Sequence, residues 1–369
     1  MKEKISIKEL FKVAIILIFL ITHTRDILKQ KIMPVIYGGY ATSGGTVIRD
    51  LLSELSVATN FTPEFRIIRE RYGLLELEES IFSVRSPENI DLAIKDFLWL
   101  VSNYSRKYRR FGKIGGEYDL HSSNMFSNLS AKFIDDISDF SYPMRWFFYE
   151  FRKNRLAEVF HRKARQYGIS DYFDDAVLAY PTHDKFINSV TLYLQGVMKG
   201  ICVANGHENA RIVGLHNAIP PYSYDLVNKS SKYFDNCRMI FVDRDPRDVF
   251  LSLPGSAESR YLPKGGNQLS KAIGFVKFYR SLRECQASVA QHSNVQLYNF
   301  EDLVLNYDSS IKSIFNFIEV EESEHIYKKN FFNPENSING VRLWKNAGKD
   351  NDEAMAYIES KLSDFLFDS

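Results

Sequence analysis

Apolar runs of strand length, each followed by a turn and an amphipathic helical segment, recur along this chain. The first run covers residues 35–37 and leads into a turn rich in glycine and hydroxyl side chains. Beyond the turn Val47, Leu51 and Leu52 recur at helical spacing, with polar side chains between them. The same order returns at residues 211–221, 238–252 and 295–304. Repeated strand–turn–helix units predict an α/β fold with three layers, α/β/α, around a central parallel sheet.

A long and mostly helical stretch interrupts these units. Helical periodicity is seen at residues 90–101, 146–167 and 183–201, and residues 107–113 mix basic and aromatic side chains. We assign residues 34–369 to one domain that carries a helical, substrate-side insertion at about 85–205. The basic and aromatic side chains have two interpretations. They form a binding surface for an acidic or extended glycan, or they lie on solvated helix faces whose aromatic residues pack inward.

Residues 1–33 form a separate N-terminal segment. Four lysines precede nine uninterrupted apolar residues at positions 13–21, fewer than the roughly 20 that span a bilayer. No small-residue cleavage site follows, unlike in a signal peptide. The alternatives are a short membrane anchor, a peripheral helix, which would associate with a membrane through residues 8–22, or a helix packed on the domain.

Composition excludes some functions. The net charge of +1 gives no electrostatic case for nucleic-acid binding. The three cysteines, Cys202, Cys237 and Cys285, show neither metal-ligand spacing nor a disulfide framework. We therefore expect a cytoplasmic protein, with or without membrane association, and the sequence indicates no oligomeric state.

The turn after the first strand has the features of an anion site. Its glycines, Gly44 and Gly45 among them, let the backbone approach a ligand, and the following helix start presents free N–H groups. Ser43 and Thr46 add hydroxyl donors, so a phosphate is the predicted ligand. The turn has no lysine, which argues against the Gly-Lys-Ser/Thr form of ATPases and kinases. A plain strand–helix turn without a ligand is the alternative.

A second motif, R-D-P-R-D-V-F-L-S, begins at Arg244 and ends at Ser252. Arg244 ends an apolar strand, and its planar fork suits a phosphate; a solvated charged turn is the alternative. Together the two motifs resemble those of sulfotransferases that use 3′-phosphoadenylyl sulfate (PAPS) and have a P-loop-like fold. The resemblance implies that residues 42–46 hold the 5′-phosphosulfate of PAPS. It also implies that Arg244 and Ser252 hold the 3′-phosphate, and that PAP is the product.

Three further segments extend the resemblance. The stretch E-F-R-I-I at residues 64–68 is similar to E-T-R-I-I of tyrosylprotein sulfotransferases, which implies Glu64 as catalytic base with Arg66 in the active site. Two residues apart, they share a face if they lie in a strand; a surface ion pair is the alternative. His216, at the end of a predicted strand, stands where the family often has lysine. It is therefore either a contact to the sulfuryl group, a base, or a structural histidine.

Residues 337–346 resemble the C-terminal cofactor loop of the family and match it at Trp344 and Lys345. Arg342 supplies the positive charge that the family places earlier in this loop.

The predicted function is transfer of a sulfuryl group from PAPS to an acceptor hydroxyl, expected on a carbohydrate, with no metal. One departure bears on catalysis. Thr42 occupies the position where most members have Lys or Arg, which stabilises charge on the leaving phosphate. Arg49, Arg66 or His216 compensates, or the chain is a non-catalytic homologue that binds PAP. A P-loop-type phosphotransferase is the remaining alternative.

Overall fold

The computed structural model describes residues 31–40, 42–105, 118, 124–143, 175–255, 264–284 and 286–367. Four features of the sequence lie outside these ranges: the apolar segment at residues 8–22, the basic–aromatic run at 107–113, the predicted helix at 146–167, and Cys285. The described residues form two compact units. Residues 1–65 and 195–369 belong to the first unit, and residues 66–194 belong to the second.

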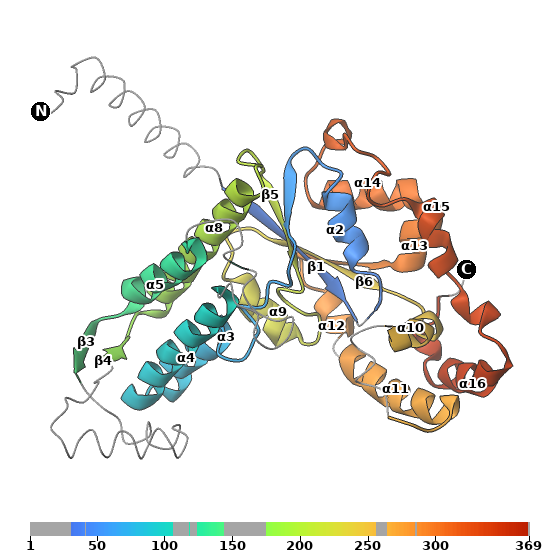
Figure 1. The fold of residues 1–369 in the computed structure, drawn as a ribbon, viewed down its shortest axis with the longest axis horizontal. Helices are drawn as coiled ribbons and strands as arrows, with labels where there is room; N and C mark the ends of the chain where they lie inside the picture. The colour runs from blue at the N-terminus through green and yellow to red at the C-terminus, as the bar shows by residue number, and fades with distance from the viewer. Residues whose placement is uncertain are drawn as a thin grey trace, which may run out of the picture. The chain divides into compact units, whose positions relative to one another are not determined.

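The first unit is built on a five-stranded sheet in the order β2-β5-β1-β6-β7 (Figure 1). Every neighbouring pair is parallel, which confirms the predicted central parallel sheet. The strands are β1 (Met33–Gly39), β2 (Ala58–Phe61), β5 (Ile212–His216), β6 (Arg238–Asp243) and β7 (Val295–Asn299).

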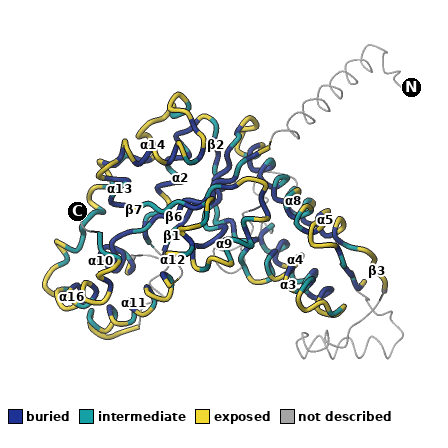
Figure 2. Tube along the Cα trace, turned by 180° about the vertical axis from the view of Figure 1, so that it is seen from behind, coloured by how far each residue is buried: buried dark blue, intermediate teal, exposed yellow. Residues whose placement is uncertain are grey.

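The central strands are buried on both faces, as parallel strands covered by helices must be. The interiors of β1 and β6 are buried without interruption, and Figure 2 shows the inner strands in dark blue. This explains why their sequences are continuous apolar runs rather than alternating ones.

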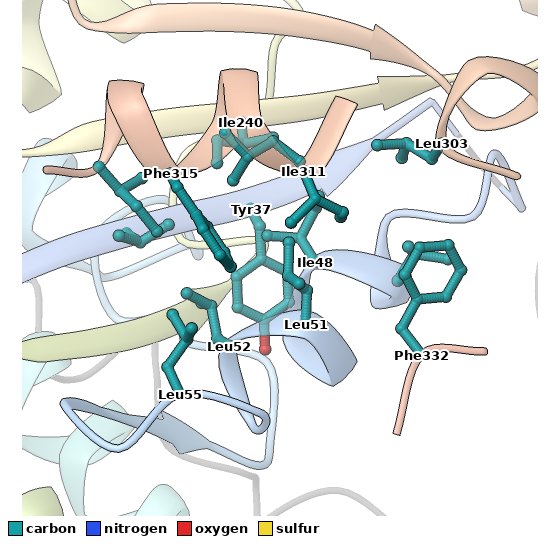
Figure 3. Packing of buried hydrophobic residues seen from close by; sticks show 14 of the residues in the cluster. Tyr37, Ile48, Leu51, Leu52, Leu55, Ile240, Leu303, Ile311, Phe315 and Phe332 are labelled. Atoms are coloured by element: carbon teal, nitrogen blue, oxygen red, sulfur yellow. The ribbon is translucent and has the colours of Figure 1, made fainter. Parts of the chain in front are cut away.

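One face of the sheet packs against α2 (Thr46–Leu52), α13 (Phe300–Leu305) and α14 (Tyr307–Phe317). Tyr37 of β1 lies at the centre of this core, between Ile48 and Leu52 of α2 and Phe315 of α14 (Figure 3). The helices α9 (Tyr224–Ser231) and α12 (Gln286–Ala290) lie on the other face (Figure 1), completing the three layers.

A second cluster joins α10 (Pro246–Ser252), α11 (Gln268–Arg283) and α16 (Asp352–Lys361). Short helical turns connect the remaining C-terminal chain. They are η2 (Leu253–Gly255), η4 (Glu322–Glu324), α15 (Pro334–Ser337), η5 (Ile338–Gly340), η6 (Leu343–Asn346), η7 (Lys349–Asn351) and η8 (Ser363–Phe365).

The helix after β5 starts later than its prolines predict. The sequence places the start at Pro220 or Pro221, but α9 begins at Tyr224. Ser223 caps it, because its hydroxyl oxygen accepts a hydrogen bond from the Leu226 N–H at 3.4 Å. A side-chain acceptor for the orphan N–H groups outweighs the favourable φ of proline.

The second unit is helical around an aromatic core that includes Phe97, Phe133, Phe186 and Tyr193. A two-stranded antiparallel sheet, β3 (Phe140–Pro143) with β4 (Asp175–Leu178), accompanies the helices. The predicted helices at 90–101 and 183–201 are both present. The helical elements are α3 (Leu74–Glu79), the π-helical turn η1 (Ser80–Val84), α4 (Pro87–Ser105), α5 (Met125–Ile137) and the first part of α8 (His183–Ala204), which ends in the first unit.

Candidate active site

The carboxyl ends of the parallel strands bring the predicted motifs to one edge of the sheet. The first loop, residues 40 and 42–45 of the described chain, follows β1, and Arg244 follows β6. Because β1 pairs directly with β6, with Gly39 opposite Val242, the two motifs are neighbours. Ligands of α/β proteins bind at this edge, where the chain crosses from one side of the first strand to the other.

The first loop is packed so tightly that two of its glycines are required. A Cβ on Gly45 would lie 2.6 Å from the Gly38 carbonyl oxygen. Gly44 has a φ of +89°, and a Cβ there would lie 2.6 Å from the Phe300 ring. The helix begins with the Val47 N–H donating to the Gly44 carbonyl at 3.0 Å. The N–H groups of residues 44–46 precede that bond and belong to the orphan donors of a helix start.

Thr42 has an unusual backbone conformation. Its φ of +36° is rare for a residue with a branched Cβ. Its carbonyl accepts a hydrogen bond from Nη1 of Arg244 at 3.3 Å. Its buried hydroxyl has no hydrogen-bond partner within the described ranges. The backbone is therefore strained at the position where most PAPS-dependent sulfotransferases have Lys or Arg.

Arg244 is a buried cation whose guanidinium, among the described residues, bonds only neutral oxygens. Its exposed fraction is 8%. Besides Thr42, Nη1 bonds Oγ of Ser252 at 3.2 Å, and Nη2 bonds the Gly340 carbonyl at 2.5 Å. In the described part of the chain no carboxylate bonds the guanidinium, and its Nε has no partner, whereas the backbone N–H donates to Asp243 at 2.6 Å. The two residues predicted to share a phosphate are therefore in direct contact.

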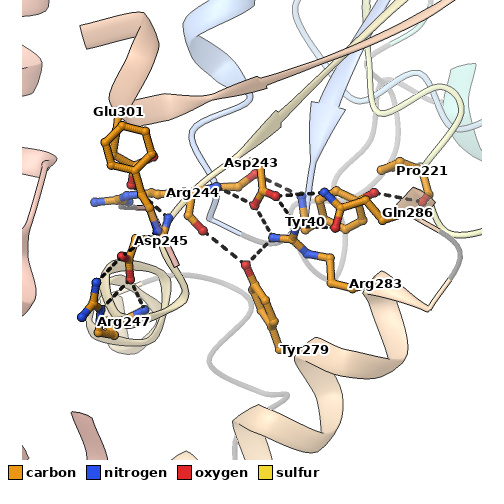
Figure 4. A network of polar contacts seen from close by, with 12 residues as sticks. Tyr40, Pro221, Asp243, Arg244, Asp245, Arg247, Tyr279, Arg283, Gln286 and Glu301 are labelled. Atoms are coloured by element: carbon orange, nitrogen blue, oxygen red, sulfur yellow. Dashed lines mark hydrogen bonds and ion pairs between the residues drawn. The ribbon is translucent and has the colours of Figure 1, made fainter. Parts of the chain in front are cut away.

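Its two buried neighbours are paired, as Figure 4 shows. Arg247 makes bonds to Asp245 at 3.0 and 2.7 Å. Arg283 pairs with Asp243 and also contacts the Tyr279 hydroxyl. Buried charges are normally compensated in this way. Arg244 differs from both neighbours because no carboxylate of the described residues bonds its guanidinium.

Burial lowers the pKa of Arg244, and the nearby Asp248, Glu301 and Asp245 oppose that shift. Its guanidinium lies 4.9 Å from the centre of the Phe300 ring, a favourable cation–π distance. Glu301 is 1% exposed, and burial raises its pKa to about 7. One of its oxygens accepts the Asp245 N–H at 2.9 Å.

Glu64 lies beside Asn217 in the first unit. Nδ2 of Asn217 donates to Oε1 of Glu64 at 2.9 Å. Asn217 has a φ of +52°, and its N–H donates to the Tyr37 carbonyl at 2.8 Å. Glu64 and Arg66 lie in the loop after β2, which ends at Phe61, so the strand alternation that would place them on one face does not apply.

Arg66 and His216 have partners of their own. Arg66 belongs to the second unit, where it pairs with Glu70 at 3.1 Å. The His216 ring stacks on Tyr37 with 5.3 Å between ring centres.

The C-terminal loop, residues 337–346, reaches the same corner. The N–H groups of Arg342 and Trp344 both donate to Asp248, at 2.7 and 3.1 Å. Lys345 lies with its Nζ 5.5 Å from the Trp344 ring centre. The sequence motifs identified this loop but not Asp248 as the acceptor of its N–H groups. A polar side chain in the middle of a phosphate motif was the available signal for Asp248.

These residues fit a ligand with two phosphate groups. Arg244, without a carboxylate partner, supplies a buried cation, and the glycine loop supplies backbone donors. Within the described ranges no group of three His, Cys, Asp or Glu side chains is arranged to hold a metal ion.

Comparisons with known proteins agree with the motifs. Residues 205–338 match the family model of the sulfotransferase domain, a range that includes Arg244 and Ser252. No curated protein matches the chain. Similar solved structures include the sulfotransferase domain from the curacin biosynthetic pathway, with 11% identity, coverage of 90% of this chain and 98% of that one, and a TM-score of 0.41.

Two other sulfotransferases are also similar. The domain from the Synechococcus PCC 7002 olefin synthase has 13% identity, coverage of 92% and 91%, and a TM-score of 0.37. Sulfotransferase STF9 from Mycobacterium avium has 12% identity, coverage of 92% and 80%, and a TM-score of 0.34. Residues 205–338 of this chain are thus similar to the sulfotransferase domain, and this similarity supports a transferase that acts on sulfuryl groups.

Proposed function

We propose that the protein transfers a sulfuryl group from PAPS to an acceptor hydroxyl. The observation that carries the proposal is the buried guanidinium of Arg244, which bonds Ser252 and, in the described part of the chain, no carboxylate. A buried guanidinium of this kind is stabilised by an anionic ligand. It lies within the matched sulfotransferase domain.

The proposed cofactor residues form two groups. Arg244 and Ser252 would hold the 3′-phosphate, whose oxygens would replace the carbonyls of Thr42 and Gly340 as acceptors. The guanidinium bonds an ionised phosphate more strongly than a neutral carbonyl oxygen, because both partners then carry charge. The N–H groups of residues 44–46 would hold the 5′-phosphosulfate, and Arg342, Trp344 and Lys345 would line the C-terminal side. Bound PAPS supplies the sulfuryl group and leaves as PAP.

Glu64 is the proposed base, and Asn217 positions it. The amide of Asn217 bonds one carboxylate oxygen at 2.9 Å, which fixes the direction of the other. Asn217 is itself held by its backbone bond to Tyr37. A carboxylate positioned in this way takes the acceptor proton as the hydroxyl attacks, an effect worth roughly 10²–10⁴ in rate.

The second candidate is a PAP-binding protein without transferase activity, and Thr42 favours it. Of the residues expected to compensate, Arg49 is bonded through two nitrogens to Asp50, at 2.9 and 2.8 Å. Arg66 is paired with Glu70, and His216 is stacked on Tyr37. If these residues supply no charge to the first loop, stabilisation of the leaving phosphate depends on the loop amides.

Three finer points belong to the same proposal. The acceptor is a carbohydrate, on the basis of the basic and aromatic residues 107–113. The second point is a cytoplasmic location, which the free thiols of Cys202 and Cys237 support. The third is membrane association through residues 8–22. An acceptor screen with labelled PAPS and fractionation of cells test these points.

Calorimetric titration of the full chain with PAP, ATP and ADP tests the proposal. We expect PAP to bind, Arg244→Ala to abolish that binding, and ATP not to compete. Binding of ATP that requires magnesium would instead support a phosphotransferase. Absence of PAP binding would refute both candidate functions.

A further inference from the structure

A buried acid stands beside the proposed phosphate site, and the proposed function does not use it. Asp248 has no exposed surface (0%). Its carboxylate attracts the guanidinium of Arg244, the group that would bind the phosphate. It thereby opposes the lowering of the Arg244 pKa by burial. Negative charge at this place opposes phosphate binding through simple repulsion. The acid therefore requires another explanation.

The bonds of Asp248 supply one. Oδ2 accepts the Arg342 N–H at 2.7 Å, and Oδ1 accepts the Trp344 N–H at 3.1 Å. Both donors belong to the C-terminal loop, 94 and 96 residues away in sequence. Arg342 has a φ of +58°, a conformation that an arginine keeps only where its surroundings hold it.

A second contact fixes the side chain of the same loop. The guanidinium of Arg247 lies 3.9 Å from the centre of the Trp344 ring. Arg247 is itself held by Asp245, and it is 5% exposed. Trp344 also packs against the apolar cluster of α10, α11 and α16. Two consecutive residues of α10 therefore hold this loop. Asp248 bonds its backbone, and Arg247 stacks on its Trp344 ring.

The loop so held forms part of the phosphate site, because its Gly340 carbonyl is the acceptor for Nη2 of Arg244. We propose that Asp248 is a positioning residue that holds residues 340–344 against α10 and thereby builds the wall of the 3′-phosphate site. This inference rests on the proposed function. It also means that the R-D-P-R-D-V-F-L-S motif has two tasks, with Arg244 and Ser252 for the ligand and Arg247 and Asp248 for the loop.

Asp248→Asn tests the inference, because the two roles of the acid predict opposite results. If Asp248 only repels phosphate, the neutral variant binds PAP more tightly. If it positions the loop, the variant loses one acceptor and binds PAP about tenfold more weakly, as expected for the loss of a hydrogen bond to a charged group. Affinity for adenosine 5′-phosphate, which lacks the 3′-phosphate, should change far less. Calorimetry of the full chain measures both ligands.

Hydrogen exchange of peptides covering residues 338–347 gives a readout that needs no ligand. We expect faster exchange in Asp248→Asn than in the natural chain. The matched control is Asp308→Asn, which removes the same charge from a side chain that is 84% exposed. It should alter neither exchange nor PAP affinity.

If Asp248→Asn fails to fold, Arg247→Lys replaces it. This variant keeps the charge and loses the planar stacking on Trp344, so it should speed exchange and weaken PAP binding. Unchanged or tighter PAP binding by a folded variant overturns the positioning role and leaves the proposed function intact. A natural chain that does not bind PAP overturns the proposed function, and the inference with it.

Discussion

The side-chain amide of Asn217 donates a hydrogen bond to Glu64 at 2.9 Å, although 153 residues separate them in sequence. Asn217 directly follows β5 and has a left-handed conformation, and Glu64 follows β2, the neighbouring strand. The carboxylate that resembles the base of tyrosylprotein sulfotransferases therefore has a defined orientation at the carboxyl edge of the sheet.

Glu64→Gln should lower kcat by about 10²–10⁴-fold and leave PAP affinity unchanged, because it removes the base and no phosphate contact. Asn217→Ala should lower kcat by about tenfold through lost orientation. Steady-state transfer from labelled PAPS and calorimetry with PAP separate the two effects. Glu208→Gln, at an exposed position, is the control. Full activity of Glu64→Gln would assign the base to another residue.

Arg244→Ala should weaken PAP binding by about 10–100-fold, since charged hydrogen bonds are worth about 1.5–3 kcal/mol. Arg244→Lys should recover only part of the loss, because a single ammonium cannot replace a fork that reaches Ser252 and Gly340 together. Arg211→Ala, which breaks an ion pair with Glu324 before β5, controls for loss of positive charge. Equal affinity of the two Arg244 variants and the natural chain would mean that the guanidinium is structural.

Gly45→Ala should destabilise the fold by about 1–3 kcal/mol and weaken PAP binding, because the new Cβ meets the Gly38 carbonyl at 2.6 Å. Gly206→Ala separates close packing from conformational strain. Gly206 has a φ of +70° but no atom within 4 Å of an added Cβ. It should cost about 1 kcal/mol without affecting PAP. Denaturant unfolding and calorimetry measure the pair, and equal PAP affinity in both would show that the first loop does not bind the ligand.

Glu301 should make stability depend on pH. Burial raises its pKa from 4.5 to about 7, so the folded state holds this proton more tightly than the unfolded state. Its contribution is fully present below pH 4.5 and is lost as the pH rises through 7. Between pH 5 and 8 the natural chain should therefore lose up to about 3 kcal/mol relative to Glu301→Gln. Unfolding free energies of the two proteins across this range test the sign, and parallel curves would contradict it.

Thr42→Lys distinguishes a slow transferase from a PAP-binding protein. The substitution places a cation where the family has one, so transfer from PAPS should become at least about tenfold faster. Thr42→Gln is the neutral control, with a long side chain at the same strained position. Single-turnover measurements follow the chemical step directly. No gain over the neutral control would show that charge at this position does not limit the reaction.

Local features of the sequence were enough for much of the fold. The apolar run before Arg244 predicted a strand, which the structure confirms as β6, and α10 begins at Pro246 with Asp245 as its N-terminal cap. The resemblance to sulfotransferases implied that Arg244 and Ser252 share a phosphate, and the two side chains are in contact because one strand end and two helical turns join them. Glu64 and Arg66 lie beyond β2, which ends at Phe61, so the alternation that would place them on one face of a strand does not apply to them.

The sequence by itself determined the parallel α/β fold and the phosphate motifs, because strand, turn and helix preferences act over a few residues. Tertiary structure decided which distant side chains meet. Asn217 forms its hydrogen bond with Glu64, and Asp248 with the N–H groups of Arg342 and Trp344, only when the chain is packed. Nothing local marks these partners, because a carboxylate or amide can bond any donor or acceptor that packing brings within about 3 Å.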